Sequence, residues 1–474
     1  MIIGREIEQQ TLSELLQREE PQFCVVYGRR RVGKTYLIRE TFNYKFTFQH
    51  TGMAKTDKKG QLVAFRDSLR AYGLTECKTP KTWVEAFSQL KQLIERAPSG
   101  KKVIFIDELP WMDTAKSGMI SALENFWNGW VTARAQKDIV LIVCGSATSW
   151  ITKKLLKNKA GLRGRLTEKV KLLPFTLYEC ERYADAVGLG MTRRDVLDTY
   201  MILGGIPYYW SFLRRGYSVV QNIDELFFTE NSKLADEFEA LYAILFNRPE
   251  KYIKVIEALS KKKCGMTRNE ILRSTKLQDG GTFSTVLEEL EQCGFIRHYV
   301  AFNSTEQGGL FQLIDNYTLF HYHCIKKNAF ADEHYWTHTY LSADHNVWAG
   351  LAFERVCLQH TRQIKEAMQI SGILSNVCSW RTDKTDEHRG AQVDLLFSRA
   401  DGVINLFEIK YSKDPFTVDA KYAHELESKL TAFRTVTKTR SAVHLTMLAS
   451  NGVVNNKYRN MIVQCLTADC LFGK

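Results

Sequence analysis

The sequence predicts a multidomain protein of the α/β class whose N-terminal part is built on a parallel β-sheet. Three apolar runs of strand length, at residues 23–27, 103–106 and 140–143, each lead into a polar or glycine-containing turn and then into helix-like sequence. Buried strands that alternate with helices are typical of a parallel sheet. At 474 residues the chain is also too long for one hydrophobic core, and ordinary domain sizes suggest roughly three or four domains.

Four domains are expected along the chain. Residues 1–175 form the parallel-sheet core, and residues 176–246 predict a small helical lid. The lid is interrupted at Leu203-Gly204-Gly205-Ile206-Pro207, where the glycines and the proline must leave helical geometry. Residues 247–328 offer three short helices and then a hairpin, which is the winged-helix plan. Residues 329–474 mix helices and strands and predict an α+β domain. Strands are expected in this last domain at residues 393–397, 403–411 and 442–447.

The composition indicates in which compartment the protein acts and which partners it binds. The chain has 65 Lys plus Arg against 53 Asp plus Glu, a formal charge of +12 and a pI near 9. This excess fits a polyanionic partner such as DNA, and it equally fits a charge that only maintains solubility. The 11 cysteines show no C-x-x-C pair, which favours reduced thiols. No signal-peptide pattern and no apolar run near the roughly 20 residues of a membrane span are present, so a cytoplasmic protein without membrane contact is expected.

A phosphate-binding loop follows the first predicted strand. Gly28, Gly33, Lys34 and Thr35 fill the four defined positions of the pattern G-x-x-x-x-G-K-[ST]. Its glycines let backbone N–H groups close around phosphates at a helix N-terminus, the lysine meets the β and γ oxygens, and the hydroxyl binds Mg²⁺. A chance match is expected in only about 1–2% of chains of this length. We therefore predict a site for ATP and Mg²⁺ with Lys34 as a catalytic residue.

Two further strand ends carry polar groups suited to that site. Asp107 and Glu108 directly follow the strand at 103–106. An aspartate there can hold the Mg²⁺ shell, and the adjacent glutamate can polarise the attacking water. Ser146 follows the strand at 140–144, where its hydroxyl can sense the γ-phosphate or orient water; a plain Gly-Ser turn is the alternative.

A basic segment comes next along the chain. It contains Lys153, Lys154, Lys157, Lys159, Arg163 and Arg165. An arginine there can stabilise transition-state charge, either in the same chain or from a neighbouring subunit of a homo-oligomer. We expect Arg163 or Arg165 in this role, and solvated surface residues are the alternative.

Together these motifs resemble the archaeal-type ATPases, a P-loop group related to the AAA+ and STAND proteins. The matching residues are Ile3-Gly4-Arg5-Glu6, Tyr27 to Thr35, Ile106-Asp107-Glu108, Cys144-Gly145-Ser146, Gly164-Arg165, Pro174-Phe175 and Gly204-Gly205-Ile206-Pro207. The resemblance implies that Ile3, Gly4 and Arg5 help to form the adenine pocket and that Pro207 belongs to a lid over the nucleotide. The expected loop contacts to the nucleotide are Gly28, Arg29, Arg30, Arg31, Val32, Gly33, Lys34, Thr35 and Tyr36. Ala147 departs from the pattern, because a second hydroxyl residue often follows the serine.

Similar proteins commonly continue into a winged helix and then a nuclease-like domain, and residues 313–320 and 350–354 resemble that continuation. The candidate site there is of the PD-(D/E)xK type. It consists of Glu354, Asp394, Glu408 and Lys410, with Asp394 and Glu408 as metal ligands. Carboxylates in such a site hold divalent ions against the scissile phosphate, and the lysine positions or activates water.

The spacing of these residues is weak support, and their strand context supports the site better. A strand period of two puts Glu408 and Lys410 on one face, and residues 398–402 are expected to form a hairpin turn. A loop of three or five residues would place Asp394 opposite Glu408, and two such close carboxylates favour a cation between them. Glu354, on a preceding helix, could complete the shell. The alternative is a solvated hairpin face with an exposed helix glutamate.

Two weaker features limit the functional hypotheses. Residues 321–324, His-Tyr-His-Cys, are expected to pack in a core rather than bind zinc. The third helix of the winged-helix region carries Glu288, Glu289 and Glu291, which argues against base reading by this helix. The first hypothesis is thus an ATP-driven switch whose C-terminal site cuts or grips DNA. The second is a signalling or assembly ATPase with a non-catalytic, protein-binding C-terminal domain. A ligand-gated transcription regulator is the third and is disfavoured by the acidic helix.

Overall fold

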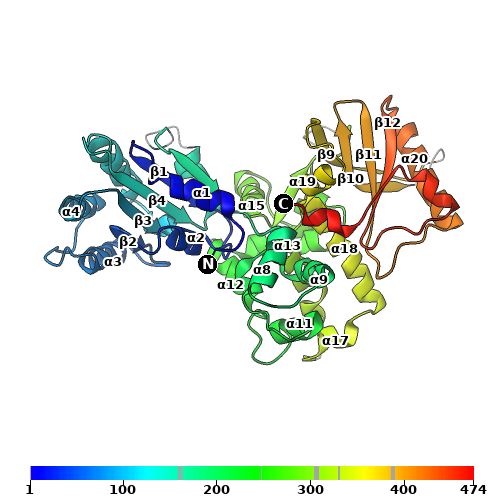
Figure 1. Cartoon of the computed structure of the whole chain (residues 1–474), viewed down its shortest axis with the longest axis horizontal. Coiled ribbons are helices and arrows are strands. Elements are labelled where there is room, and N and C mark those ends of the chain that lie inside the picture. The colour runs from blue at the N-terminus through cyan, green and yellow to red at the C-terminus, as the bar shows by residue number, and fades with distance from the viewer. Residues whose placement is uncertain are drawn as a thin grey trace. The chain divides into compact units, whose positions relative to one another are not determined.

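The computed structural model describes residues 2–157, 162, 164–246, 248–303, 309–328, 331–385 and 390–474. The chain divides into two compact units, Met1–Pro174 and Phe175–Lys474 (Figure 1). The predicted division into four domains stays a prediction at this level.

Unit 1 is built on a parallel sheet, as predicted, and the sheet has five strands. Its strands are β1 (Gln22–Tyr27), β2 (Phe48–Thr51), β3 (Lys102–Asp107), β4 (Ile139–Gly145) and β5 (Glu168–Lys171). They are ordered β2-β3-β4-β1-β5, and every neighbouring pair is parallel. β1, β3 and β4 are almost wholly buried, which explains their continuous apolar sequence.

Helices cover this sheet and place its site residues. They are α1 (Glu6–Glu14), α2 (Lys34–Thr41), α3 (Lys58–Ala71), α4 (Trp83–Arg96), α5 (Leu109–Met112), α6 (Met119–Phe126) and α7 (Thr148–Ile151), with π-helical turns at Trp127–Val131 and Thr152–Leu156. Alternate strand residues, such as Phe23, Ile104 and Leu141, pack with α3, α4 and α6 in one core. α2 begins directly at the end of the phosphate-loop sequence, and α5 begins directly after Glu108.

Unit 2 begins with a helical region. Its helices are α8 (Leu177–Ala186), α9 (Arg193–Leu203), α10 (Pro207–Trp210), α11 (Val219–Phe227) and α12 (Glu237–Leu245). The predicted break is present, because α9 ends before Gly204, which has a φ of 60°, and α10 starts at Pro207. Gly205 also needs to be glycine, since a Cβ there would lie 1.8 Å from the Phe175 carbonyl oxygen.

The next region contains three helices and a small antiparallel sheet. The elements are α13 (Glu250–Ser260), β6 (Met266–Thr267), α14 (Arg268–Thr275), α15 (Gly281–Gln292), β7 (Ile296–Tyr299) and β8 (Leu310–Leu313). Thr267 caps α14 in a capping box with Glu270, as its position before the helix predicts. Glu289 and Glu291 accept hydrogen bonds from the Tyr252 hydroxyl at 2.6 Å and from the His298 amide at 3.1 Å. These are the elements that the winged-helix prediction requires, and the assignment to that family remains a prediction.

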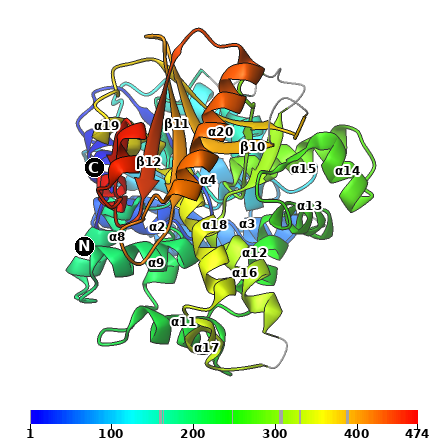
Figure 2. The ribbon, with the colours of Figure 1, turned by 90° about the vertical axis from the view of Figure 1, so that its right-hand side faces the viewer.

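The last region contains the predicted mixture of helices and strands. Its elements are α16 (Asn316–His323), a 3-10 turn (Ile325–Lys327), α17 (Tyr335–Thr339), α18 (Ala343–Gln359), α19 (Thr361–Ala367), β9 (Ser375–Thr382), β10 (Ala391–Arg399), β11 (Val403–Lys410), α20 (Ala420–Thr437), β12 (Ala442–Ala449), a 3-10 turn (Lys457–Met461), β13 (Gln464–Leu466) and a final 3-10 turn (Ala468–Phe472). The five strands are ordered β13-β12-β11-β10-β9, with antiparallel pairing of β9, β10 and β11 and parallel pairing of β11, β12 and β13. Figure 2 shows α20 lying along one face of this sheet, where Leu426 and Phe433 join its core.

Several secondary features bear on the sequence predictions. His321 is buried and stacks on Phe238 with ring centroids 4.0 Å apart, in agreement with core packing. All eleven cysteines lie in the described residues and are free thiols. In the described part of the chain, no helix has both the length and the apolar character needed to cross a lipid bilayer.

Candidate functional site

The phosphate-loop sequence forms a tight turn between β1 and α2. Arg31 and Gly33 adopt positive φ values of 71° and 90° inside it. Lys34 is the first residue of α2, and its Nζ donates to the carbonyl oxygens of Gly28 and Arg29, both at 3.0 Å. Burial lowers the pKa of the Lys34 ammonium. The ammonium is therefore held within the curve of its own loop, where phosphate oxygens would meet it.

The N-terminal segment and the start of the phosphate loop both lie against Leu172 and Leu173. Gly28 has a φ of 153°, and a Cβ there would lie 2.1 Å from the carbonyl oxygen of Leu172. Next to that residue, the Leu173 carbonyl oxygen accepts a 2.5 Å hydrogen bond from Nη2 of the buried Arg5. The residues predicted to form the adenine pocket, Ile3 to Arg5, thus lie near the beginning of the phosphate loop.

Asp107 is the meeting point of three strand or loop ends. Its Oδ2 accepts from the Thr35 hydroxyl at 2.9 Å, and its Oδ1 accepts from the Cys144 thiol at 2.6 Å and from the Glu108 amide at 3.0 Å. Burial and the neighbouring Asp107 raise the pKa of Cys144 well above its usual value, so the thiol stays protonated and donates. Thr35 and Asp107, predicted as Mg²⁺ ligands, are thus brought together.

Glu108 and Ser146 form the second part of this arrangement. The Ser146 hydroxyl lies 2.9 Å and 3.0 Å from the two carboxylate oxygens of Glu108, and the Ser146 amide donates to Oε2 at 3.1 Å. This contact follows from the strand order, because β4 lies between β1 and β3 and therefore brings Ser146 between the loop and Glu108. Ser146 is held on Glu108 rather than projecting alone from a Gly-Ser turn.

A buried glutamine that the sequence reading missed fixes the backbone around Glu108. Nε2 of Gln61 donates to the carbonyl oxygens of Met53 at 2.6 Å and Trp111 at 2.8 Å, and its Oε1 accepts from the Met53 amide at 3.1 Å. Gln61 therefore ties the start of α3 to α5, the short helix that follows Glu108. No sequence motif signals this contact, because it joins residues fifty positions apart.

The remaining predicted nucleotide residues differ in their surroundings. Arg29 and Val32 are buried, whereas the side chain of Tyr36, at the start of α2, is 48% exposed. In the described structure, Nε of Arg30 is buried without a hydrogen-bond partner. Arg165 is exposed in the turn before β5, and Arg163 lies outside the described residues. Pro207 starts α10 in unit 2, so its predicted place over the nucleotide remains a prediction.

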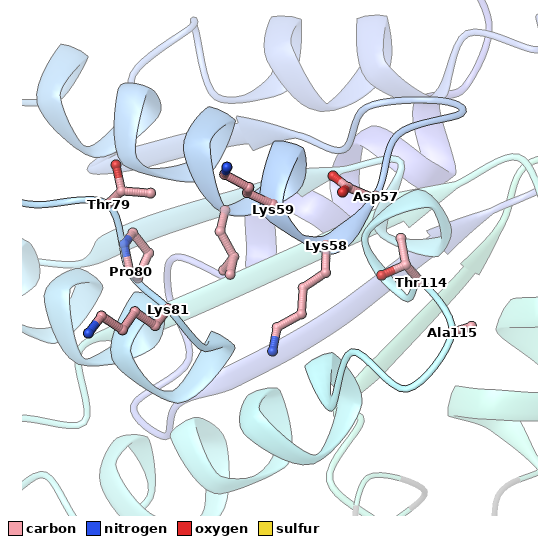
Figure 3. Close-up of a pocket in the computed structure, with 9 residues that line it drawn as sticks. Asp57, Lys58, Lys59, Thr79, Pro80, Lys81, Thr114 and Ala115 are labelled. Carbon is pink, nitrogen blue, oxygen red and sulfur yellow. The ribbon is translucent and has the colours of Figure 1, made fainter.

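A separate hollow of about 710 Å³ lies at the start of α3 in unit 1. Figure 3 shows the residues around it, which come from the start of α3 and from two loops. They include Asp57, Lys58, Lys59, Thr79, Pro80, Lys81, Thr114 and Ala115. None of the predicted site residues lines this hollow.

The predicted carboxylates of unit 2 line one cavity of about 450 Å³. Glu354 reaches it from α18, Asp394 from β10, and Glu408 and Lys410 from β11. The hairpin register pairs Leu396 with Leu406, and a strand irregularity between Val393 and Leu396 interrupts the regular pairing of β10 at Asp394. β10 ends at Arg399 and β11 begins at Val403, so the loop has three residues, which is one of the two predicted lengths, and the placement of Asp394 opposite Glu408 stays a prediction.

Glu408 is surrounded by donors. Its Oε2 accepts from Lys429 Nζ at 2.6 Å, and its Oε1 lies 2.5 Å from the Tyr422 hydroxyl and 3.3 Å from Lys410 Nζ. Burial alone would raise the pKa of Glu408, but Lys429 and Lys410 hold that pKa below its usual value. Glu408 is therefore ionised at neutral pH.

Glu354 and Asp394 share a different lysine. Lys263 Nζ lies 2.6 Å from Glu354 Oε1 and 3.7 Å from Asp394 Oδ2. Asp394 Oδ1 also accepts from Gln392 Nε2 at 2.5 Å. Burial, followed by the charge of Asp394, raises the pKa of Glu354 to about 7. Among the described atoms, Oε2 of Glu354 is buried without a hydrogen-bond partner.

The carboxylate oxygens are suitable ligands for a hard divalent cation, but their positions in this structure do not form a metal site. Oxygen ligands suit Mg²⁺ and Mn²⁺, and the unpartnered Oε2 of Glu354 is a ready acceptor. However, within the described residues no three His, Cys, Asp or Glu side chains are grouped so that they could hold a metal ion. Lys263 and Lys429, which line the cavity, and Tyr422, which contacts Glu408, were missed in the sequence because they lie on other elements than the predicted carboxylates: Lys263 before β6, and Tyr422 and Lys429 on α20.

Comparison with known proteins bears mainly on the first site. Residues 3–212 match the family described as an ATPase domain predominantly from Archaea. An uncharacterized protein of Methanocaldococcus jannaschii is 24% identical over 417 residues, which covers 84% of each chain. The similarity to this protein therefore extends beyond residues 3–212.

Two solved structures also align with the chain. A Walker-type ATPase of Pyrococcus abyssi is 17% identical, with a TM-score of 0.48, over 67% of this chain and 95% of that one. The ORC2 protein of Aeropyrum pernix, solved as ADPNP and ADP complexes, is 11% identical, with a TM-score of 0.41, over 70% of this chain and 96% of its own.

Proposed function

Residues 3–212 are an ATPase domain of the family found predominantly in Archaea, and from this premise we propose that the chain is an ATP-driven switch coupled to a nuclease-like site that acts on DNA. The observation that supports the second half most strongly is the cavity lined by Glu354, Asp394, Glu408 and Lys410. The proposal has three parts, which are nucleotide chemistry, nucleic-acid chemistry and their coupling.

In the first part, Lys34 and the loop from Gly28 to Tyr36 bind the phosphates. Lys34 exchanges its two carbonyl partners for phosphate oxygens, which suits an ammonium whose burial disfavours an unpaired charge. Thr35 and Asp107, already in contact, are the oxygen ligands that would hold Mg²⁺. A bound Mg²⁺ would neutralise charge that develops on the transferred phosphoryl group.

Glu108 is the residue we assign to activating the attacking water. In this arrangement its carboxylate is engaged by the hydroxyl and amide of Ser146. A γ-phosphate that accepts a hydrogen bond from Ser146 would free one carboxylate oxygen to accept from water. Ser146 would thereby couple the presence of ATP to the availability of the base.

Further nucleotide contacts belong to the same proposal. Ile3, Gly4 and Arg5 line the adenine pocket, and Pro207 belongs to the lid. Arg165 is exposed, which suits an arginine that completes the site of a neighbouring subunit in a homo-oligomer.

In the second part, Asp394 and Glu408 would hold a divalent cation, Glu354 would complete its shell, and Lys410 would orient water. The cavity combines carboxylate oxygens with the ammonium groups of Lys410 and Lys429, and such a mixture suits a metal-assisted reaction at a phosphodiester. The net charge of +12 on the chain is consistent with attraction to DNA.

In the third part, α9 couples the lid to β11. The Tyr411 hydroxyl lies 2.5 Å from Asp198 Oδ1, and the Arg194 guanidinium lies 4.3 Å from the centre of the Tyr411 ring. Arg194 also donates to the Ser412 carbonyl oxygen at 3.2 Å. Since α9 leads into the Gly204 to Pro207 break and Tyr411 follows Lys410, movement of the lid would reach the nuclease-like strand through these contacts.

The test is cleavage of linear and circular DNA with Mg²⁺ or Mn²⁺, with and without ATP. We expect cleavage by the wild type, its loss in Glu408→Ala, and a changed response to ATP in Lys34→Ala, which should also lose ATP hydrolysis. Glu427→Ala, an exposed change on α20, and Lys45→Ala, an exposed change after α2, are matched controls. Intact ATP hydrolysis without any cleavage would refute the nuclease half.

A second candidate function is a signalling or assembly ATPase whose C-terminal domain binds a protein. The observation that favours it is the engagement of Glu354 and Glu408 by lysines, which leaves no ready-made metal cluster among the described residues. This alternative would be supported over the first if the wild-type chain neither binds nor cleaves DNA while residues 329–474 bind a protein partner.

A further inference from the structure

Lys263 enters the carboxylate cavity from outside the elements that carry its acidic residues. It lies between α13 and β6, in the region predicted to be a winged helix, whereas Glu354 belongs to α18 and Asp394 to β10. Its Nζ lies 2.6 Å from one carboxylate and 3.7 Å from the other. A positive charge thus already occupies the place between two of the proposed metal ligands.

The backbone of Lys263 is fixed at this place. Its carbonyl oxygen accepts from Nη2 of the buried Arg355 at 2.6 Å and from Nε2 of Gln312 at 2.8 Å. The next carbonyl, that of Cys264, accepts from the Tyr299 hydroxyl at 2.5 Å. Gly265 then turns with a φ of 79°, where a Cβ would lie 2.5 Å from the Phe311 carbonyl oxygen. These hydrogen bonds therefore fix the backbone of the turn that presents Lys263, and they leave the side chain of Lys263 unrestrained.

The side chain of Lys263 can reach solvent, whereas the Glu354 carboxylate is buried. The lysine side chain is 50% exposed, although its ammonium is paired. Glu354 is only 10% exposed, so departure of the ammonium leaves a buried carboxylate that needs another cation, while the flexible lysine stem lets the ammonium reach solvent. The ammonium can therefore swing into solvent while the backbone stays in place.

Resting on the proposed function, we infer that Lys263 is an internal counter-cation of the carboxylate cavity, which a divalent cation must displace before the site can work. A Mg²⁺ ion binds carboxylate oxygens at about 2.0–2.1 Å. An ion on Glu354 Oε1 would then lie within about 5 Å of the Lys263 ammonium, which is itself 2.6 Å from that oxygen. Two cations so close repel each other, so the lysine and the metal compete for the same oxygens.

This arrangement makes the metal requirement of the site dependent on Lys263. With the lysine in place, the carboxylates are neutralised without a metal, and the affinity for a divalent cation is reduced. Any event that draws the ammonium away, such as its attraction to a DNA phosphate, would favour metal binding. Metal and DNA would then bind with positive coupling.

The test measures Mn²⁺ binding to the full-length chain by the paramagnetic resonance signal of free Mn²⁺, without nucleotide or DNA. We expect Lys263→Met to tighten the binding by roughly tenfold or more. Lys263→Arg, which keeps the charge, should bind like the wild type. Lys262→Met removes an exposed positive charge one residue away and is the matched control.

The outcomes separate this inference from the proposed function. If Asp394→Ala leaves Mn²⁺ binding unchanged in every background, the cavity is not a metal site and the proposed nuclease function fails. If Asp394→Ala removes the binding but Lys263→Met does not tighten it, the competition is refuted and the proposed function stands. Equal melting temperatures for Lys263→Met and Lys263→Arg would show that any difference in binding does not come from misfolding.

Discussion

One hydroxyl group connects the end of β4 to the carboxylate proposed to activate water. Ser146 contacts both oxygens of Glu108, and its amide adds a third contact. We predict that Ser146→Ala lowers kcat for ATP hydrolysis by roughly tenfold to a hundredfold, because the γ-phosphate loses the hydroxyl donor assigned to it and only the backbone amide remains to orient Glu108. The affinity for ATP should change little, since the loop and Lys34 are untouched. Steady-state hydrolysis and equilibrium nucleotide binding measure the two quantities.

A nearby hydroxyl provides the control for this substitution. Thr148 is buried two residues further on, and its Oγ1 has no hydrogen-bond partner among the described residues. Thr148→Val keeps the shape and removes only that hydroxyl, so it should leave kcat near the wild-type value. A normal kcat in Ser146→Ala would contradict the assigned role of Ser146.

At this scale, the residues that the sequence predicted are those contained in short motifs. Gly28, Gly33, Lys34 and Thr35 form a pattern whose chemistry is local, and Asp107 and Glu108 follow a recognisable strand. Gln61 and Lys263 were missed because they act through contacts to residues far away in the sequence. A side chain that works across fifty or more residues leaves no spacing in the sequence to detect.

At the scale of elements, α9 and β11 share the contacts proposed to transmit nucleotide state. We predict that Tyr411→Phe removes the bond to Asp198 but keeps the ring against Arg194. Basal DNA cleavage should persist, whereas the difference between cleavage with and without ATP should shrink at least about twofold, because a lost hydrogen bond of about 1 kcal/mol weakens the coupling. Cleavage assays with and without ATP measure this ratio.

Tyr217→Phe removes a more exposed hydroxyl in the same unit and serves as the control. It should leave the ATP response unchanged. An unaltered response in Tyr411→Phe would contradict the proposed path and direct attention to other contacts of α9.

The elements that the sequence predicted share one property, which is a strong apolar pattern. β1, β3 and β4 are buried on both faces and were read as continuous apolar runs. β2 and β5 were missed because they are four residues long and have the polar sequences FQHT and EKVK. They become strands because a neighbour supplies the hydrogen bonds, a tertiary effect that local propensity does not contain.

At the scale of the whole molecule, buried histidines lower the stability of the folded state at acid pH. Burial lowers the pKa of His50, His321 and His360 from 6.5 to about 4. Between pH 6.5 and 4 the unfolded chain therefore binds protons that the folded chain excludes. The folded state should lose stability as pH falls through this window, by up to about 1.4 kcal/mol per pH unit for each group.

Urea unfolding at several pH values measures this dependence. Both ring nitrogens of His360 are hydrogen-bonded. Nδ1 donates to the Val356 carbonyl oxygen at 2.8 Å, and Nε2 accepts from the Leu177 amide at 3.0 Å. His360→Gln should make the dependence shallower between pH 6.5 and 4, even if it lowers stability overall. His424→Gln, at an exposed position on α20, should leave the slope unchanged. A wild-type midpoint that is constant from pH 7 to 4 would contradict the prediction.

The parallel order of the sheet in unit 1 also has a practical consequence. All its candidate chemistry lies at the carboxyl ends of the strands, and the amino ends at Gln22, Lys102 and Ile139 carry none of the predicted site residues. The exposed Glu95, near the end of α4 and shortly before β3, is thus a suitable position for a fluorescent label, as is the exposed Val436 on α20. Because all eleven native thiols are at least partly buried, cysteines introduced at these two positions would react first. Energy transfer between the two dyes would report ATP-driven movement between the units directly.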